Sequence, residues 1–162
     1  MAHSAEIYSI TYKPLHSVDK PDGFLRVSVD HATLLAGYGI EGDRKGGHPK
    51  RQINLIGKST LDALRAKGYN TQPGAMGEQM IVSGIDVDDL PVGTLIQLGE
   101  SATVEVTGVR AGCAKFETTQ GFCIEDTIGQ MGVMVRVIAG GQVHTGDSLT
   151  ILSELSAMLE HG

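Results

Sequence analysis

Residues 91–109, PVGTLIQLGESATVEVTGV, carry the pattern that decides the fold class. Two short apolar runs, 91–99 and 102–109, are rich in branched side chains and stand on either side of Gly99, Glu100 and Ser101. Short runs of this kind around a glycine-containing connection are typical of a β-hairpin. The stretch therefore predicts two antiparallel strands joined by a tight turn.

Similar short runs recur along most of the chain. The 22 glycines fall singly or in pairs between these runs, which is the spacing of turns in an all-β protein rather than of helix interiors. The further runs predicted as strands are residues 5–12, 24–29, 51–57, 78–84, 132–141 and 148–152. Together with the hairpin they make about eight strands, and the pattern predicts one mainly β domain, a closed or nearly closed β-barrel.

Helices are predicted to be few and short. Residues 59–68, STLDALRAKG, place Leu61 and Leu64 on one helical face. Ser59, followed three residues later by Asp62, resembles a capping pair at the start of this helix. The end of the chain is predicted to form a second short helix, with an apolar face of Leu155, Met158 and Leu159.

Composition excludes several classes of protein. The net charge is −6, whereas a duplex nucleic-acid binder needs a broad basic face. Aromatic residues make up only 4% and Trp is absent, so no platform for stacking bases is expected. No apolar run approaches the roughly 20 residues that cross a bilayer, and the first residues lack a signal-peptide pattern. We expect a cytoplasmic protein of one domain, residues 1–162, with no nucleic-acid or membrane partner.

A cationic loop follows the predicted second strand. Four of the thirteen Lys and Arg residues of the chain lie within residues 44–51, where the only neighbouring acid is Asp43. Glycines let such a backbone turn tightly, and cations on it suit phosphate or another compact anion. A solvated basic loop is the alternative interpretation. The residues expected on this side of a ligand pocket are Arg44, Lys45, His48 and Arg51, with Asn54 and Glu78 behind them.

A second group of reactive residues lies in VTGVRAGCAKFETTQ, residues 106–120. Cys113 follows Gly112 in a predicted turn, between Arg110 and Lys115. A thiolate is the reactive form of cysteine, and nearby cations favour it, so Cys113 is the candidate reactive centre. The alternative is a small buried apolar side chain. Cys123, ten residues further on, is interpreted as packing, with a redox partnership as its alternative.

The remaining titratable residues give weaker signals. The chain contains no HxxxH or CxxC spacing, so a closed zinc site is not expected. Glu78 lies in PGAMGEQMIV, where a turn leads into a strand. It is either an exposed carboxylate at the start of that strand or a partner for Arg44 or Arg51.

Five segments in this order resemble the MOSC domain family, named for the C-terminal part of molybdenum-cofactor sulfurases. They are GIEGDR at 39–44, KRQINLIG at 50–57, the long segment 73–100 beginning PGAMGEQ, VTGVRAGCAKF at 106–116 and GVMVRVIAGGQVHTGDSL at 132–149. Two departures stand out: Gln79 occupies a position where the family usually has Asn, and Gly112 one where many relatives have Pro.

The resemblance implies a MOSC-like β-barrel with a few short helices and a role with molybdenum cofactor, a pyranopterin with a dithiolene and a terminal phosphate. It implies that Cys113 either carries sulfur or ligates molybdenum, both tasks for a soft thiolate. Arg44, Lys45, His48, Arg51, Asn54, Glu78, Arg110 and Lys115 are the expected cofactor-binding residues. The expected partners are the cofactor or a sulfur donor protein, with a homodimer as the arrangement in which a second subunit completes the pocket.

Three functions fit these observations. The first is a molybdenum-cofactor-binding protein that acts either as a cysteine-based sulfur carrier or as a small reductase of N-hydroxylated compounds. The second is a non-catalytic module that binds a pterin or phosphorylated ligand and delivers it. The third is a thiol redox protein that uses Cys113 and Cys123.

Overall fold

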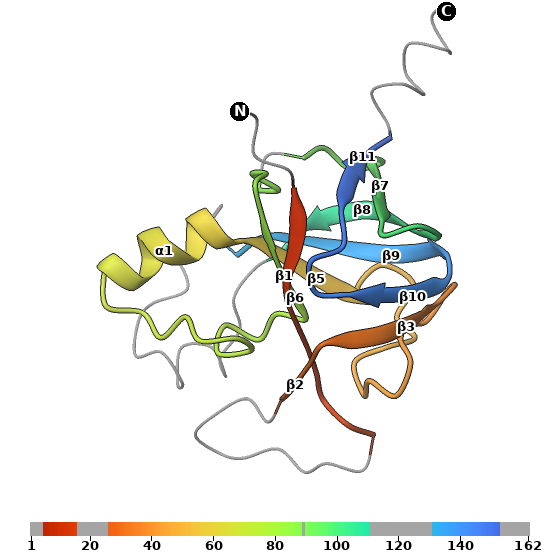
Figure 1. The fold of residues 1–162 in the computed structure, drawn as a ribbon, viewed down its shortest axis with the longest axis horizontal. Helices are drawn as coiled ribbons and strands as arrows, with labels where there is room; N and C mark the ends of the chain where they lie inside the picture. Colours follow the sequence, from red (N-terminus) through yellow and green to blue (C-terminus); the bar gives the residue numbers. More distant parts are fainter. Residues whose placement is uncertain (1–4, 16–25, 89, 111–130, 153–162) are drawn as a thin grey trace, which may run out of the picture.

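The computed structural model describes residues 5–15, 26–88, 90–110 and 131–152, and these residues are mainly β (Figure 1). The strands are β1 (Glu6–Tyr12), β2 (Val27–Val29), β3 (His31–Leu35), β4 (Gly39–Ile40), β5 (Ile53–Gly57), β6 (Met80–Ser83), β7 (Leu95–Leu98), β8 (Ala102–Val109), β9 (Val133–Ala139), β10 (Gly141–His144) and β11 (Leu149–Ile151). The helix among these residues is α1 (Lys58–Ala66). The predicted second helix at the end of the chain lies outside the described residues.

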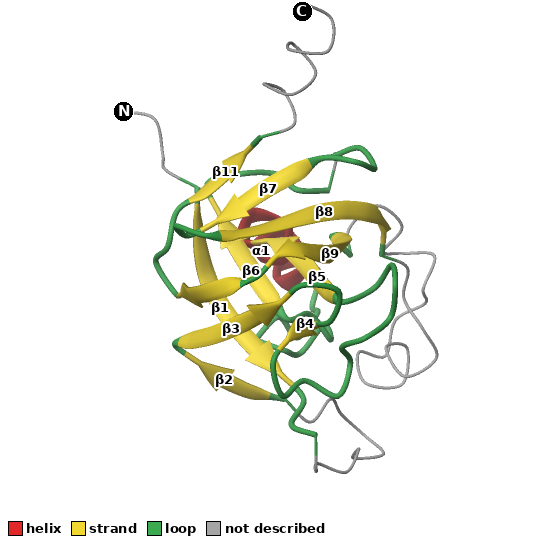
Figure 2. Cartoon of the chain, turned by 90° about the vertical axis from the view of Figure 1, so that its right-hand side faces the viewer, coloured by secondary structure: helices red, strands yellow, loops and turns green. Residues whose placement is uncertain are grey.

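The strands form two sheets (Figure 2). The larger has the order β11-β7-β8-β9-β5-β6-β1-β2, and the smaller has the order β10-β3-β4. Neighbouring strands are antiparallel except β5 and β6, which are parallel. Parallel strands need a long crossover connection, and the segment containing α1 supplies it.

The predicted hairpin is confirmed. Strands β7 and β8 pair antiparallel, with Leu98 opposite Ala102 at the turn. Gly99 has φ of +66°, a conformation that glycine adopts without steric cost, and it opens the turn as expected.

The expected closed barrel is not found: within the described residues both sheets are open. Strands β11 and β2 form the two ends of the large sheet. A single antiparallel bridge, Glu6 to Ser148, joins the start of β1 to the residue before β11. The Ile7 N–H donates to the Asp147 carbonyl at 2.9 Å, and the Leu149 N–H donates to the Ala5 carbonyl at 3.0 Å. These contacts bring β11 beside the start of β1 without extending the ladder along it.

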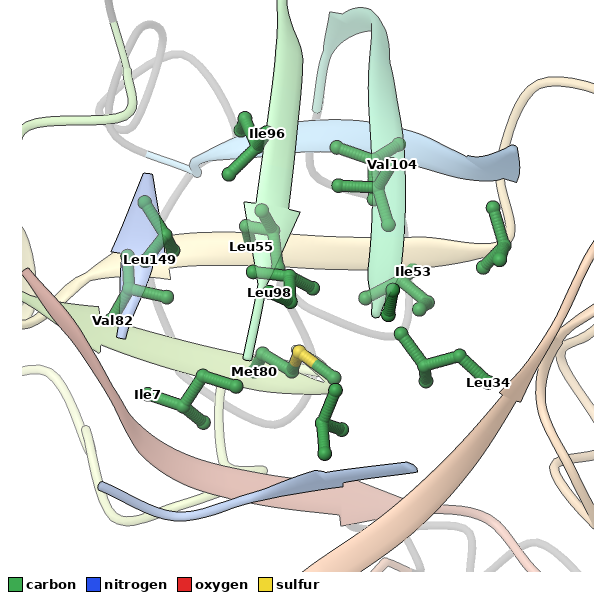
Figure 3. Packing of buried hydrophobic residues seen from close by; sticks show 14 of the residues in the cluster. Ile7, Leu34, Ile53, Leu55, Met80, Val82, Ile96, Leu98, Val104 and Leu149 are labelled. Atoms are coloured by element: carbon green, nitrogen blue, oxygen red, sulfur yellow. The ribbon is translucent and has the colours of Figure 1, made fainter. Parts of the chain in front are cut away.

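Aliphatic side chains fill the space enclosed by the sheets (Figure 3). Strands β5 and β6 are buried on both faces, as expected where strands run parallel with a helix on one side. Leu55 and Met80 point into the main cluster, whereas Ile56 and Ile81 pack in a second cluster with Leu64 of α1. The core is therefore mainly aliphatic, in keeping with the low aromatic content of the chain.

Helix α1 buries Leu61 and Leu64, as the periodicity predicts, but the predicted cap is wrong. The N-cap is Gly57, which makes no side-chain cap hydrogen bond, so Ser59 already lies inside the first turn. Asp62 instead pairs on the helix surface with Lys58 at 3.2 Å and with Arg65 at 3.1 Å. No helix among the described residues is both long and apolar enough to cross a membrane.

The short strands β3, β4 and β10 are absent from the sequence prediction. They are two to five residues long, and His31 and His144 make β3 and β10 polar at one end. Strand β10 pairs with β3 across more than 100 residues, as in Ala32 with Val143, and β4, which pairs with β3 nearby in the chain, has only two residues. A local pattern therefore gave little indication of them.

Candidate functional site

The carboxylate of Asp43 anchors the cationic loop, here residues 44–51, from inside the protein. Asp43 is completely buried. Its Oδ1 accepts hydrogen bonds from the backbone N–H groups of Lys13 at 3.2 Å and Lys45 at 3.1 Å. Its Oδ2 accepts a hydrogen bond from Nε2 of Gln79 at 3.2 Å. The acid that directly precedes the loop cations thus has its charge directed inward, toward donors of the protein itself.

The side-chain amides of Gln79 and Asn54 extend the hydrogen bonds from Asp43 to β5 and on to the start of β9. Oε1 of Gln79 accepts the Asn54 backbone N–H at 2.9 Å. Nδ2 of Asn54 donates to the carbonyls of Met131 and Val133, each at 3.1 Å. Gln79 and Asn54 are both buried, and each joins strands that are distant in the sequence.

Gly132 allows the chain to pass close to β5 at this point. It has φ of +77°, and a Cβ atom at this position would overlap the Leu55 carbonyl oxygen. Any other residue here would push the start of β9 away from β5. The Gly132 carbonyl also accepts the Arg110 backbone N–H at 3.0 Å, so this approach positions the end of β8.

Arg110 lies at the outer end of this chain of hydrogen bonds. Its NH1 donates to Oδ1 of Asn54 at 3.2 Å and to the Met76 carbonyl at 2.6 Å. Arg110 follows β8 directly and stands three residues before Cys113 in the sequence. Two fixed acceptors on different segments therefore hold its guanidinium in one place.

Glu78 lies on the inner side of the same turn and is 1% exposed. Its carboxylate accepts backbone N–H groups from Gly74 at 2.5 Å and Met76 at 3.1 Å. Burial raises the pKa of the Glu78 carboxyl above its ordinary value, although these hydrogen bonds and the charge of Arg26 oppose the shift. Glu78 is therefore a buried part of the turn rather than an exposed carboxylate, and its pairing with Arg44 or Arg51 stays a prediction.

We call Asp43, Gln79, Asn54, Glu78 and Arg110 the buried polar network. The first four are buried, and Arg110 is half-buried at its edge. The network joins four of the sequence segments that carry the family resemblance, from the Gly-Asp-Arg turn to the strand before Cys113. It holds these segments in fixed relative positions.

The cationic loop presents its charged groups to solvent. Lys45, His48, Lys50 and Arg51 are exposed, and Arg44 is half-buried. Nδ1 of His48 accepts the Lys50 backbone N–H at 3.0 Å, and its Nε2 lies 3.5 Å from NH2 of Arg51.

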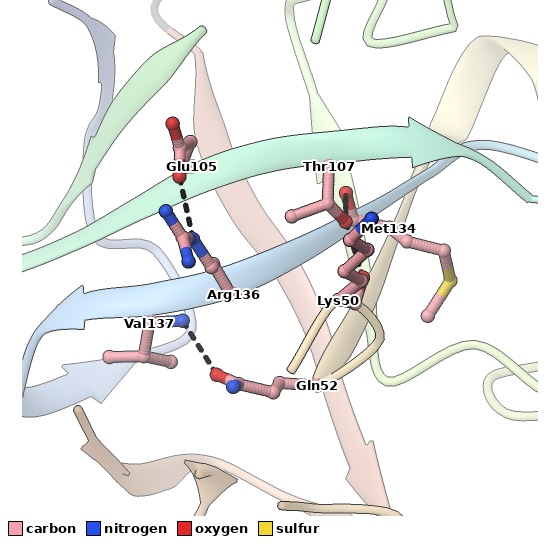
Figure 4. Close-up of polar contacts among 7 residues, drawn as sticks. All are labelled: Lys50, Gln52, Glu105, Thr107, Met134, Arg136 and Val137. Carbon is pink, nitrogen blue, oxygen red and sulfur yellow. Dashed lines mark hydrogen bonds and ion pairs between the residues drawn. The ribbon is translucent and has the colours of Figure 1, made fainter. Parts of the chain in front are cut away.

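Two contacts fix the ends of the loop. Tyr38 packs where a Cβ on Gly46 would collide with its ring, and its hydroxyl donates to the Asp43 carbonyl at 2.6 Å. At the other end, Oγ1 of Thr107 donates to the Lys50 carbonyl (Figure 4). The loop therefore ends against β8, near the end of the strand that leads to Arg110.

The structure thus places most of the predicted residues in two connected groups. Asn54 and Arg110 are in direct contact, and Glu78 contacts the same turn through Met76. Lys45 and its neighbours join them through the Asp43 carboxylate. The positions of Cys113, Lys115 and Cys123 lie outside the described residues.

The sequence alone does not predict the roles of three buried polar residues in and around the network, Asp43, Gln79 and Gln52. The sequence indicates Asp43 only as the acid beside the cations, and Gln79 only as a departure from the family pattern. Gln52, whose Oε1 accepts the Val137 N–H at 2.8 Å, was not singled out (Figure 4). The available signal for Asp43 was a single acid placed between Gly42 and a run of cations.

The described residues also surround an open hollow of about 900 Å³ beside β1, β2 and β3. None of the predicted site residues that the structure describes lines it. Within the same described part of the chain, no group of three or more His, Cys, Asp and Glu side chains is arranged to hold a metal ion.

A profile of the MOSC domain matches residues 42–150, which is more than half of the chain. The chain belongs to the MOSC domain family. The match covers Asp43, Asn54, Glu78, Gln79 and Arg110, and it spans Cys113. The resemblance drawn from the sequence is confirmed.

Solved structures agree with this assignment at the level of the fold. The MOSC domain matches YuaD from Bacillus subtilis with a TM-score of 0.71 and 20% identity, over 91% of this chain and 94% of that one. It matches YiiM from Geobacillus stearothermophilus with a TM-score of 0.71 and 22% identity, over 91% and 74%. For YiiM from Escherichia coli the TM-score is 0.66 with 20% identity, over 93% and 69%. A search of curated protein sequences finds no match.

Proposed function

We propose that this MOSC domain binds molybdenum cofactor and acts through Cys113. The observation that carries the proposal is the buried polar network, which ends at Arg110, three residues before Cys113. A network that ties four segments together and ends three residues before a cysteine in the sequence is suited to holding a reactive group in place. The family is associated with molybdenum cofactor, which gives this arrangement its expected ligand.

The cationic loop fits the phosphate end of that cofactor. Its cations are exposed while the neighbouring carboxylate of Asp43 is buried and satisfied internally, so the outer face of the loop is positive. Lys45, His48 and Arg51 would hold the phosphate, with Arg51 able to donate two parallel hydrogen bonds. The contact between Thr107 and Lys50 supports a common ligand site with the end of β8.

Arg110 serves in this proposal as a positioning residue. Its guanidinium is held by Asn54 and by the Met76 carbonyl, so its positive charge is fixed near the start of the segment that contains Cys113. A fixed cation close to a thiol lowers the pKa of that thiol and favours the thiolate. Lys115 would add to this effect from the other side of Cys113.

Two modes of action use the same residues. As a sulfur carrier, the Cys113 thiolate would attack the outer sulfur of a donor protein's persulfide, forming a Cys113 persulfide and releasing the donor thiolate. As a reductase, the protein would need an electron-transfer partner, because converting an N-hydroxylated compound to the amine and water takes two electrons and two protons. When bound, the cofactor supplies the redox-active metal, for which a Cys113 thiolate is a suitable soft ligand.

The test is the molybdenum and persulfide content of protein purified from a molybdenum-replete host. Near-unit molybdenum that is lost in Cys113→Ser would support the reductase mode, and a labile persulfide without molybdenum would support the carrier mode. Cys123→Ser is the matched control and should keep either loading. If Cys113→Ser retains the full cofactor content, Cys113 is not the centre and the protein is a binding and delivery module.

Alkylation of each cysteine as a function of pH tests the role of Arg110. Cys113 should react faster than Cys123 at neutral pH, and Arg110→Ala should slow Cys113 alone. Asn54→Ala, which removes one of the acceptors that hold Arg110, should slow it in the same direction. An unchanged rate in both variants would remove Arg110 from the proposal.

A further inference from the structure

Two histidines face each other across the smaller sheet, away from the buried polar network. His31 of β3 and His144 of β10 are direct partners in the antiparallel ladder. Directly opposed side chains of such a pair lie on the same side of the sheet. Their ring centroids are 5.9 Å apart with the planes tilted by 32°, and both side chains are more than half exposed.

Each histidine has a carboxylate near its Nδ1, within hydrogen-bond distance at His31 and further away at His144. Nδ1 of His31 lies 2.6 Å from Oδ1 of Asp30, and Nδ1 of His144 lies 3.7 Å from Oδ2 of Asp147. Oδ2 of Asp147 also accepts the His144 backbone N–H at 2.8 Å, which fixes the carboxylate beside its histidine. A carboxylate that accepts a hydrogen bond from Nδ1–H keeps the proton on Nδ1 and leaves the lone pair on Nε2, a form in which histidine binds a metal.

A backbone contact holds the two halves together. The Thr145 N–H donates to the Asp30 carbonyl at 3.0 Å, so the turn after β10 is tied to the residue that precedes β3. The two His–Asp pairs are therefore parts of one rigid corner of the sheet rather than side chains on independent loops.

We propose that His31 and His144 form a binding site for a divalent first-row transition metal such as Cu²⁺, Ni²⁺ or Zn²⁺. A metal at about 2 Å from a nitrogen of each ring sets the two ring centroids about 5–6 Å apart, which matches the observed spacing. Imidazole nitrogen suits these ions, and affinity should be highest for Cu²⁺. Asp30, at 2.6 Å from Nδ1 of His31, acts as a positioning residue that keeps that ring in the binding tautomer, and the carboxylate of Asp147 places a negative charge 3.7 Å from Nδ1 of His144.

The site would be open rather than closed. Two protein ligands leave the remaining coordination positions to water or to a small molecule, whereas a closed structural site uses four protein ligands. The hollow beside β1, β2 and β3 begins at this corner, since Asp30, His31 and Thr145 line part of it. Such a site suits exchangeable binding, and it rests on none of the residues of the proposed cofactor site.

Calorimetric titration of the purified protein with Ni²⁺ tests the proposal. His31→Ala and His144→Ala should each weaken binding at least tenfold, and Asp30→Asn should weaken it by roughly 10–100-fold through loss of the positioning carboxylate. His48→Ala, which removes another exposed histidine, is the matched control and should leave the affinity unchanged. These exposed substitutions should not affect folding, which circular dichroism would verify.

Electron paramagnetic resonance of the Cu²⁺ complex gives an independent measurement. The wild-type spectrum should show coupling to two imidazole nitrogens, and each single alanine variant should show coupling to one. Affinity that is unchanged in the His31→Ala/His144→Ala double variant would overturn the proposal, because the ion would then bind elsewhere. A spectrum without coupling to imidazole nitrogen in the wild type would overturn it as well.

Discussion

The buried polar network and the cationic loop are neighbours in the chain, yet they use polar side chains in opposite ways. Asp43 is completely buried and accepts three hydrogen bonds from within the protein. The side chain of Lys45, only two residues later, is exposed, and the backbone N–H of Lys45 donates to the Asp43 carboxylate. Within three residues the chain changes from a side chain that holds the structure to one that faces solvent.

Because of this difference, we expect the buried polar network to determine the stability of the protein and the cationic loop to determine ligand binding. A buried hydrogen-bonded group is costly to remove because its partners are left without an acceptor or donor. An exposed cation can be removed at little cost, but it is available to an anionic ligand. The two regions should therefore respond in opposite ways to substitution, and the following predictions test that contrast.

The largest effect is expected for Asp43→Ala. The change leaves the N–H groups of Lys13 and Lys45 and the Gln79 amide without their buried acceptor. We expect the free energy of unfolding to fall by about 3 kcal/mol, measured by urea denaturation followed by circular dichroism.

Asp43→Asn is the matched control for that variant. Its Oδ1 can still accept from both backbone N–H groups, but its amide nitrogen faces the donor of Gln79. The loss should therefore be smaller than in Asp43→Ala. A change below about 1 kcal/mol in Asp43→Ala would show that the Asp43 carboxylate does not anchor the loop.

A smaller, pH-dependent effect is expected from Glu78. Because burial raises its pKa in the folded protein, the folded state binds more protons than the unfolded state between the ordinary and the raised pKa. The free energy of unfolding should therefore fall as the pH rises through that window, by at most about 1.4 kcal/mol per pH unit. Above the raised pKa the contribution is constant.

Glu78→Gln should abolish this slope, since glutamine does not titrate in the window. Urea denaturation at several pH values from the ordinary glutamate pKa upward measures it. Glu100→Gln, in the exposed turn between β7 and β8, is the matched control and should keep the wild-type slope. A slope that persists in Glu78→Gln would mean that another group causes it.

The sequence predicted the parts of the fold that depend on local pattern. The hairpin around Gly99 and the helix face of Leu61 and Leu64 follow from spacing alone, and the structure confirms both. Open sheets replaced the expected barrel because closure depends on how the first and last strands meet. Among the described residues, β1 and β11 are joined by the bridge from Glu6 to Ser148 and by no longer ladder, and no local pattern encodes such a bridge.

The site was predictable to a similar extent. Clustered cations identified the loop, and the contact between Asn54 and Arg110 joins two of the residues chosen from the sequence. The role of Gln79 could not be predicted, because its amide connects Asp43 to Asn54, residues that come together only in the folded chain. Polarity suggests exposure for such residues, and only the three-dimensional partners show why they are buried.

The smallest effect on stability is expected for Arg51→Ala, at the exposed side of the comparison. Arg51 is exposed, and its contact with His48 is long at 3.5 Å, so the free energy of unfolding should change by less than about 0.5 kcal/mol. Retention of the cofactor should nevertheless fall, because the loop loses the cation best suited to a phosphate. Molybdenum content after extensive dialysis, measured beside urea denaturation, gives both quantities for one variant.

Arg65→Ala is the matched control, since Arg65 is an exposed arginine of α1 that pairs with Asp62 at 3.1 Å. It should cost equally little stability and leave molybdenum content unchanged. Equal retention in the two variants would contradict a binding role for Arg51, even if Asp43→Ala loses stability as expected. A large loss of stability in Arg51→Ala would contradict the contrast itself, because the exposed cations would then belong to the structural framework.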